Sequence, residues 1–185
     1  ICIVCGSTWP EDEAVLLPYM NAAPNHVKFI VAPHQMNEQK IVQFQEQLKK
    51  PSIRYTTNTH GTLNEASVFI LDTIGLLTKI YSYADIAYVG GAMGTTGLHN
   101  ILEPATFGVP VVIGQHYDEF PEAIRLRSLA GLFSVSTSAE ATDILSKLAN
   151  DKDFRNSSGM IAGHFVNSNT GATRIVMKTI KALLP

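Results

Sequence analysis

Cysteine and long apolar runs are both scarce in this sequence, and each shortage excludes a class of protein. The two cysteines, Cys2 and Cys5, lie in the apolar run ICIVC. Residues three apart on a β-strand point to opposite faces, so the two thiols cannot share a metal ion or readily form a disulfide. No apolar run approaches the roughly 18 residues that a membrane-spanning helix needs. The sequence therefore indicates a soluble globular domain whose cysteines are small core residues.

Basic residues are neither abundant nor clustered. The chain has 14 Lys and Arg against 16 Asp and Glu, a formal net charge of -2, and its like charges do not form blocks. Proteins that bind nucleic acid rely on clustered Lys and Arg to contact the phosphate backbone. We therefore expect no nucleic-acid partner.

Several motifs of catalysis and metal binding are also missing. The sequence has no Asp-x-Asp and no His pair at ligand spacing, so we expect no bound metal ion. It has no Walker loop, no G-x-G-x-x-G fingerprint and no G-x-S-x-G nucleophile elbow. None of these motifs therefore points to a catalytic residue, and we expect no cofactor.

The sequence does contain a regular alternation of short apolar runs with helical segments. This alternation predicts an α/β fold with a Rossmann-like parallel sheet flanked by helices, in a single domain over residues 1–185. The expected strands are residues 1–5, 27–32, 52–57, 67–72, 85–91, 109–114 and 132–136. The expected helices are residues 11–23, 38–50, 76–84, 100–108, 119–131, 138–151 and 153–185, the last broken near 167–171, and a loop is expected at 60–66.

Local signals predict where helices begin. Ser7 or Thr8 is expected to cap the first helix, Asn37 the second and Ser138 the sixth, because short polar side chains accept hydrogen bonds from the first free amides. Pro18 is expected to kink or shorten the first helix.

Ligands of parallel sheets bind beyond the carboxyl ends of the strands. This rule selects the loops at 6–10, 33–37, 73–75, 90–100 and 115–120 as candidates for a binding site.

The loop at 90–100 begins the stretch GGAMGTTGLHNILEP and is rich in glycine. Glycine permits sharp bends and lets a ligand approach the backbone closely. A helix beginning near His99 or Asn100 would offer free N–H groups to an anion, and Glu103 could bind a ribose diol. The alternative is a tight turn in which the glycines relieve steric clashes and Glu103 complements the helix dipole. The residues alone leave both open.

Two smaller features are equally ambiguous. The Gly6-Ser7-Thr8 turn is either a helix cap or the opposite wall of a phosphate site, and His34 after Pro33 is either solvated or a ligand contact. For Asp72, at the end of an expected strand, a structural role is favoured.

The order of motifs resembles a known family. The segments are DTIG (72–75), YSYADIAYVGG (81–91), GLHNILEPA (97–105), GVPV (108–111) and Phe120. Together they are similar to the C-terminal, donor-binding half of a GT-B glycosyltransferase, with the 3-deoxy-D-manno-octulosonic acid (Kdo) transferase family as the nearest match. The resemblance runs from residue 1 to about residue 136. It implies nucleotide contacts at Ser7, Thr8, Pro33, His34, Gly75, Leu76, Gly91, Ala92, Gly97, His99, Asn100 and Glu103.

This chain departs from the family pattern at several positions. The family's Pro-Arg-His is Ala32-Pro33-His34 here, without the Arg, and Leu76 stands where Glu is usual. Leu98 and Ala92 also differ from the usual residues. These departures bear on nucleotide contacts but leave the phosphate loop and Glu103 in place.

The resemblance implies transfer of Kdo from CMP-Kdo to a lipid A precursor, with inversion and without metal, at the cytoplasmic face of the inner membrane. The general base and the membrane association would belong to an N-terminal acceptor domain absent from this chain, whose first residue already begins an apolar run. We therefore expect the domain alone to bind nucleotide without turnover. Two alternatives are a GT-B-like sugar-nucleotide 2-epimerase and a non-catalytic nucleotide-sugar binding domain.

Overall fold

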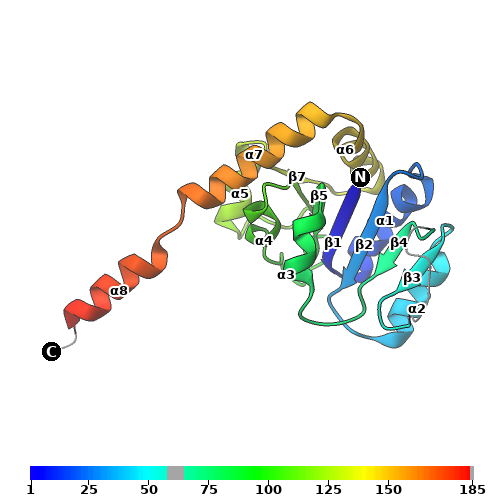
Figure 1. Cartoon of the computed structure of the whole chain (residues 1–185), viewed down its shortest axis with the longest axis horizontal. Helices are drawn as coiled ribbons and strands as arrows, with labels where there is room; N and C mark the ends of the chain where they lie inside the picture. Colours follow the sequence, from blue (N-terminus) through cyan, green and yellow to red (C-terminus); the bar gives the residue numbers. More distant parts are fainter. Residues whose placement is uncertain (58–64, 184–185) are drawn as a thin grey trace.

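The computed structural model describes residues 1–57 and 65–183, and most of the loop expected at 60–66 lies outside them. The described residues form a parallel sheet in the order β3-β4-β2-β1-β5-β6-β7, with helices on both faces (Figure 1). Every pair of neighbouring strands is parallel, which confirms the predicted fold class. The strands are β1 Cys2–Thr8, β2 Lys28–Pro33, β3 Ser52–Arg54, β4 Val68–Ile70, β5 Ile86–Val89, β6 Val111–Ile113 and β7 Leu132–Ser134.

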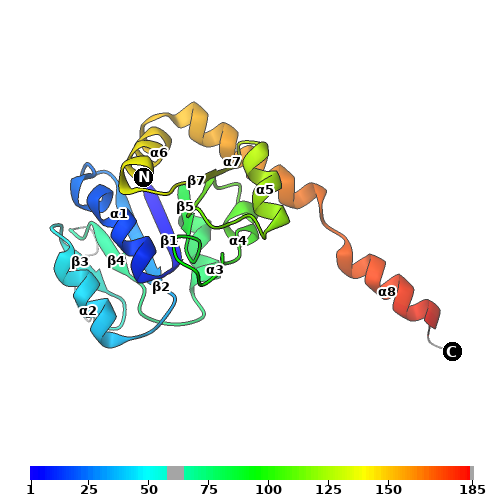
Figure 2. The same ribbon diagram turned by 180° about the vertical axis from the view of Figure 1, so that it is seen from behind.

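The helices cover the sheet in two layers (Figures 1 and 2). Helices α1, α2 and α6 bury their apolar sides in one core cluster, whereas α4, α5 and α7 share a second cluster on the other face. The segment α3 with its 3-10 extension η1 belongs to a third, smaller cluster around Tyr81. The bounds are α1 Pro10–Ala22, α2 Glu38–Gln47, α3 Leu77–Ile80, η1 Tyr81–Tyr83, α4 Leu102–Thr106, α5 Pro121–Ser128, α6 Ser138–Asn150 and α7 Lys152–Ser168.

Successive side chains of β1 point to opposite faces of the sheet and so contribute to different core clusters. Ile3 and Cys5 belong to the cluster beneath α1, whereas Val4 faces the cluster around Tyr81. Cys2 packs against the cluster around Tyr81 and Cys5 lies in the cluster beneath α1, so the two thiols point to opposite faces as predicted, and both are free. Burial raises the pKa of the Cys2 thiol to about 11, which keeps it protonated and unreactive at neutral pH.

Two of the predicted helix caps are wrong, and one is confirmed. The strand β1 continues through Thr8, so Trp9 occupies the N-cap of α1 in place of Ser7 or Thr8. The sixth helix is capped by Thr137, not by Ser138, while Asn37 caps α2 by accepting a hydrogen bond from the Lys40 amide.

Pro18 does not end the first helix. It lies within α1 at an exposed position, and the helix runs on to Ala22.

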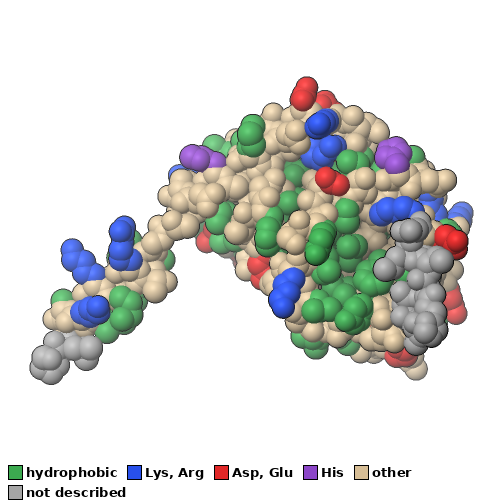
Figure 3. All heavy atoms as spheres, viewed as in Figure 1, with side chains coloured by type: hydrophobic (Ala, Val, Ile, Leu, Met, Phe, Trp, Pro, Cys, Tyr) green, Lys and Arg blue, Asp and Glu red, His purple; other side chains and the backbone are tan. Residues whose placement is uncertain are grey.

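The last helix, α8 Ala172–Leu183, extends away from the domain and has no buried residue (Figures 1 and 3). Its exposed apolar residues are Ile175, Val176, Met177, Ile180 and Leu183. Its charged residues are Arg174, Lys178 and Lys181, all basic. Within residues 1–57 and 65–183, no helix has both the length and the apolar character needed to cross a lipid bilayer.

Candidate functional site

The carboxyl ends of β1, β2 and β5 are joined by backbone hydrogen bonds. The His34 amide donates to the Thr8 carbonyl at 2.8 Å, which holds the end of β2 against the end of β1. The Gly90 amide donates to the Gly6 carbonyl at 2.9 Å, and the His99 amide donates to the Gly90 carbonyl at 3.1 Å. Three of the five predicted loops therefore meet at one edge of the sheet.

Asp12, in the first turn of α1, links two of these loops. Its side chain is fully buried and accepts three hydrogen bonds: from the Tyr88 hydroxyl at 2.7 Å, the Gly91 amide at 2.9 Å and the Trp9 amide at 2.9 Å. Burial raises the pKa of Asp12, and these hydrogen bonds oppose the rise. A buried carboxyl with three donors is a structural anchor, because losing it would leave three polar groups unpaired.

Three aromatic rings lie together at the same edge. The Trp9 and His34 rings are stacked with centroids 4.7 Å apart, and the His34 and His99 centroids are 4.3 Å apart. The Trp9 indole N–H also donates to Nε2 of His99 at 3.1 Å. The structure thus brings together the two predicted histidines, and it adds Trp9, which the sequence analysis did not select.

The glycines of the β5–α4 loop are needed for close approach, but the approaching group is the protein's own backbone. A Cβ on Gly90 would lie 2.3 Å from the Ser7 carbonyl oxygen. Gly91 has φ +96°, and a Cβ there would lie 2.1 Å from the Gly97 carbonyl oxygen. Ser7 itself has φ +53°, at the point where the β1–β2 register shifts. The turn is therefore tight for structural reasons, whatever ligand it holds.

The middle of this loop leaves its amides available. Between Gly94 and Leu98, none of the backbone N–H groups donates to another residue that the structure describes. Two depressions flank the segment, with volumes of about 370 and 350 Å³, and both are lined by Phe120. The first also contains Asp118 and Glu119, whose carboxylates can accept hydrogen bonds from hydroxyl groups.

The predicted helix after the loop is shorter than expected. It begins at Leu102, not near His99 or Asn100, and has five residues. The Asn100 carboxamide oxygen accepts a hydrogen bond from the Leu102 amide at 3.0 Å, and its nitrogen donates to Glu103 at 3.2 Å. A helix this short has a weak dipole, so an anion at this position would depend on the loop amides and not on a helix N-terminus.

Glu103 lies toward the cluster around Tyr81. Burial raises the pKa of the Tyr81 phenol, and the charge of Glu103 raises it further. Tyr81 in turn lies against Gly6, where an added Cβ would come 2.0 Å from the phenolic oxygen. Glu103 therefore lies between Asn100, which donates a hydrogen bond to it, and the cluster around Tyr81.

Gly75 and Leu76 begin the segment that leads into α3. Gly75 has φ +90° with open space around its Cα, and Leu76 is the N-cap residue of α3. The next residue, Leu77, comes within 3.0 Å of a Cβ added to Gly6. This loop therefore borders the site beside Tyr81.

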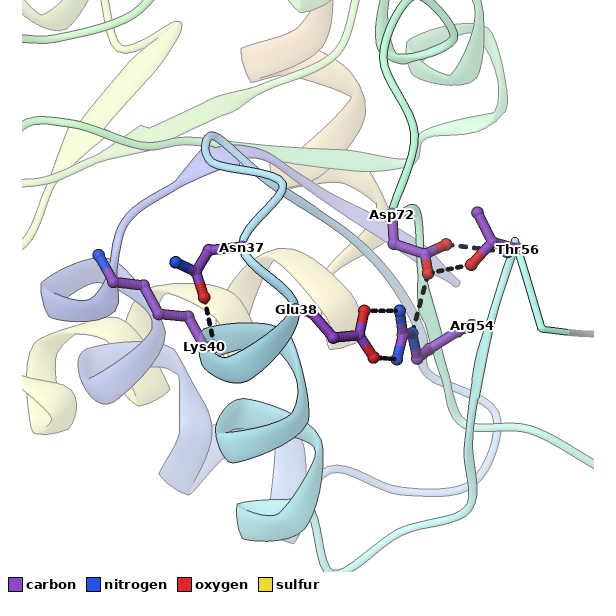
Figure 4. Close-up of polar contacts among 6 residues, drawn as sticks. All are labelled: Asn37, Glu38, Lys40, Arg54, Thr56 and Asp72. Atoms are coloured by element: carbon purple, nitrogen blue, oxygen red, sulfur yellow. Dashed lines mark hydrogen bonds and ion pairs between the residues drawn. The ribbon is translucent and has the colours of Figure 1, made fainter.

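Asp72, at the end of β4, has a structural role (Figure 4). It accepts hydrogen bonds from the Thr56 amide at 2.9 Å and from Nε of Arg54 at 2.8 Å. The other guanidinium nitrogens of Arg54 bind Glu38 at 2.6 Å each. Burial alone would raise the pKa of Asp72, but the hydrogen bonds from Thr56 and Arg54 outweigh it and lower the pKa.

The family pattern has an Arg before the histidine that corresponds to His34, and this chain lacks it. The contacts of Arg54 decide whether Arg54 could bind a phosphate group in its place. Arg54 lies at the end of β3, on the edge of the sheet that carries the site. All three of its guanidinium nitrogens already bind carboxylates, and its side chain is 11% exposed. Arg54 is therefore not available to a phosphate group.

Another depression lies away from this site. It has a volume of about 570 Å³, lies between α5, β7 and α6, and contains none of the predicted site residues. Its lining mixes Arg127 and Lys147 with Glu140 and Asp143, so it offers no excess of one charge.

Three residues of the site escaped the sequence analysis: Trp9, Asp12 and Tyr88. Asp12 is the third residue of α1, and its side chain accepts a hydrogen bond from the amide of the N-cap residue, Trp9. This contact is half of a capping box. Its spacing is a local signal in the sequence. The contact with Tyr88 has no local signal.

No protein-family model matches the chain. A 3-deoxy-D-manno-octulosonic acid transferase from Haemophilus influenzae is 31% identical over 179 residues, which are 94% of this chain and 42% of that protein. One from Chlamydophila psittaci is 34% identical over 116 residues, which are 62% of this chain and 26% of that protein. The chain thus spans less than half the length of these relatives.

A solved structure agrees with these relatives. The crystal structure of the C-terminal CMP-Kdo binding domain of WaaA from Acinetobacter baumannii matches with a TM-score of 0.76 at 22% identity, covering 91% of this chain and 89% of that one. The two kinds of similarity, in sequence and in fold, point the same way. The chain is similar in sequence to less than half the length of known Kdo transferases, and it has the fold of a GT-B C-terminal domain.

Proposed function

We propose that this chain is the donor-binding domain of an enzyme that transfers Kdo from CMP-Kdo to a lipid A precursor. Similarity to Kdo transferases supports transferase chemistry, and the convergence of the β1, β2 and β5 loops supports a ligand at that edge of the sheet. The acceptor, the general base and contact with the cytoplasmic face of the inner membrane are assigned to the part of the protein outside this chain.

The observation that carries the proposal is the free run of amides from Gly94 to Leu98. Backbone N–H groups that point into a concave loop bind phosphate oxygens without a cation. His34 and His99 lie beside the loop, and Arg54 is committed to carboxylates. The proposal therefore assigns the phosphate of the donor to main-chain amides of this loop.

The remaining groups suit the other parts of a nucleotide sugar. Glu103 can accept hydrogen bonds from the ribose hydroxyls, as the resemblance implies. The depression beside Gly94 offers Asp118 and Glu119 to sugar hydroxyls. These two carboxylates repel the carboxylate of Kdo, so that group would point away from them.

The reaction assigned to the whole enzyme is displacement at the anomeric carbon of Kdo by an acceptor hydroxyl, with inversion. The departing CMP becomes a phosphate monoester, and its oxygens gain negative charge in the transition state. Amides fixed around that phosphate stabilise this charge without having to reorganise. This chain holds the leaving group, while the base that takes the acceptor's proton lies elsewhere, so the chain alone binds donor and does not turn over.

A nucleotide panel tests the proposal. The melting temperature of the chain is measured with CMP, CDP, UDP and GDP, and calorimetry then gives the affinity of each ligand that stabilises it. CMP should raise the melting temperature because it binds the native state and not the unfolded chain. Stabilisation by UDP alone would contradict the Kdo assignment and favour the 2-epimerase alternative. No effect of any nucleotide would overturn the donor-binding role.

A further inference from the structure

The hydrogen bond between Trp9 and His99 fixes which ring nitrogen of His99 carries a proton. An indole Nε1–H is a donor only, whereas each nitrogen of a neutral imidazole is either a donor or an acceptor. Nε1 of Trp9 lies 3.1 Å from Nε2 of His99. That nitrogen must therefore be the unprotonated one, and Nδ1 carries the hydrogen.

The groups that face His99 favour the neutral ring on balance. Burial and the neighbouring His34 lower the pKa of His99, and the charge of Asp12 opposes them. Glu122, on α5, lines the same depression as His99. Protonation at Nε2 would also set two N–H groups against each other, with the Trp9 donor facing a second donor. The hydrogen-bond geometry and the burial therefore favour an uncharged ring, against the opposing carboxylates of Asp12 and Glu122.

We propose that Trp9 is a positioning residue that holds His99 as the neutral Nδ1–H tautomer, so that His99 offers an uncharged N–H donor to the anionic nucleotide. The role in binding rests on the proposed function, whereas the tautomer rests on the structure alone. The two rings come from segments 90 residues apart, so the contact also sets where the β5–α4 loop lies against the start of α1.

This arrangement has a consequence for pH dependence. Imidazole ordinarily gains its proton near pH 6.5, and a phosphate ligand would bind the charged form more strongly. With Nε2 engaged by Trp9 and the ring partly buried, His99 gains its proton at a lower pH than a free imidazole. The contribution of His99 to nucleotide affinity therefore changes little between about pH 6 and about pH 8.

The tautomer is tested on the free chain by ¹⁵N NMR of the histidine rings. The wild type should show the Nδ1–H tautomer at His99 and a midpoint of titration below that of a model imidazole. Trp9→Phe retains an aromatic ring beside His34 but removes the indole N–H, so the tautomers should mix and the midpoint should rise. An Nε2–H tautomer in the wild type, or identical His99 spectra in the two proteins, would overturn the proposal.

The role in binding is tested by CMP affinity at about pH 6 and about pH 8 in both proteins. Relative to the wild type, Trp9→Phe should gain about threefold or more in affinity at the lower pH. Protonation of the CMP phosphate affects both proteins equally, so the ratio of their affinities isolates the ring. An equal ratio at the two pH values overturns the role in binding. If neither protein binds CMP, that role fails together with the proposed function, while the ring spectra still decide the tautomer.

Discussion

Tyr88 and Asp12 are 76 positions apart and meet in a buried hydrogen bond of 2.7 Å from the phenolic hydroxyl to Oδ1. Both side chains are fully inaccessible to solvent. Tyr88→Phe should therefore lower the free energy of unfolding by about 1–3 kcal/mol, because a buried acceptor loses one donor. Urea denaturation measures the change, and Tyr83→Phe, at a residue 72% exposed, is the matched control that should leave stability nearly unchanged. Equal effects of the two substitutions would contradict the anchoring role of Asp12.

The same pair predicts a pH dependence. The pKa of Asp12 is raised in the folded state by burial, so the folded state binds the proton more tightly than the unfolded chain. The stabilisation from that proton is present below the unfolded pKa and is lost as pH rises through the folded pKa. Removing the Tyr88 donor raises the folded pKa further. The cost of Tyr88→Phe should therefore be larger at neutral pH than at about pH 4.

Gly90 is predicted to tolerate no side chain. In Gly90→Ala the new Cβ would lie 2.3 Å from the Ser7 carbonyl oxygen and 2.9 Å from Oδ2 of Asp12, so the backbone must move. We expect a loss of about 1–3 kcal/mol in the free energy of unfolding together with weaker CMP binding. In the control Gly94→Ala, the nearest atom is 3.3 Å away on the Glu11 side chain, and stability should change little. A stable Gly90→Ala with normal CMP affinity would show that the Ser7 turn is not fixed.

The two ion pairs of Arg54 distinguish the effect of burial on stability from the effect of distance. The ion pair with Glu38 is the shorter, 2.6 against 2.8 Å, but the Glu38 side chain is 68% exposed and that of Asp72 is 2% exposed. Arg54→Met should cost about 1–3 kcal/mol, since buried Asp72 loses a charged donor. Glu38→Gln should have a small effect because solvent screens exposed pairs. Thermal and urea unfolding compare the two, and a larger loss in Glu38→Gln would reverse this ranking.

The lowered pKa of Asp72 predicts how that cost depends on pH. Because the folded pKa is below the unfolded value, the stabilisation is present above the unfolded pKa and is lost as pH falls through the folded one. Arg54→Met removes one cause of the depression. The difference between the wild type and Arg54→Met should therefore shrink as pH is lowered below about 4.

Glu103 is the predicted contact for the ribose. Glu103→Ala should weaken CMP binding by about 1–3 kcal/mol through the lost charged hydrogen bonds, with the fold unchanged by circular dichroism. Glu46→Ala, at an exposed residue of α2, removes the same charge away from the site and should leave the affinity as in the wild type. An unchanged affinity in Glu103→Ala would reduce Glu103 to a complement of the α4 dipole.

The sequence predicted the sheet and its order of elements well, because apolar periodicity is a local property. The predictions from sequence failed where contacts between residues distant in the sequence determine the local structure. Thr8 extends β1 because it pairs with Pro33 of β2, and this pairing removes it from the cap. The helix after the glycine loop begins late because the Asn100 side chain binds the Leu102 amide.

The candidate site likewise combines features that the local sequence predicts with contacts that it does not predict. Glycine content and strand ends indicated loops that do converge, and the predicted His34 and His99 meet there. The bonds of Asp12 to Tyr88 and of Trp9 to His99 span 76 and 90 positions. They depend on the β1–β5 register, and no pattern in a short window predicts that register.

The exposed helix α8 has one more implication. It has 12 residues, which is near the length below which an unsupported helix is only marginally stable in water. With no packing against the described domain to sustain it, α8 should gain or lose helical content according to what its apolar side meets. Far-ultraviolet ellipticity from this segment would therefore act as a built-in gauge of association, rising when a suitable surface is supplied and falling when it is withdrawn.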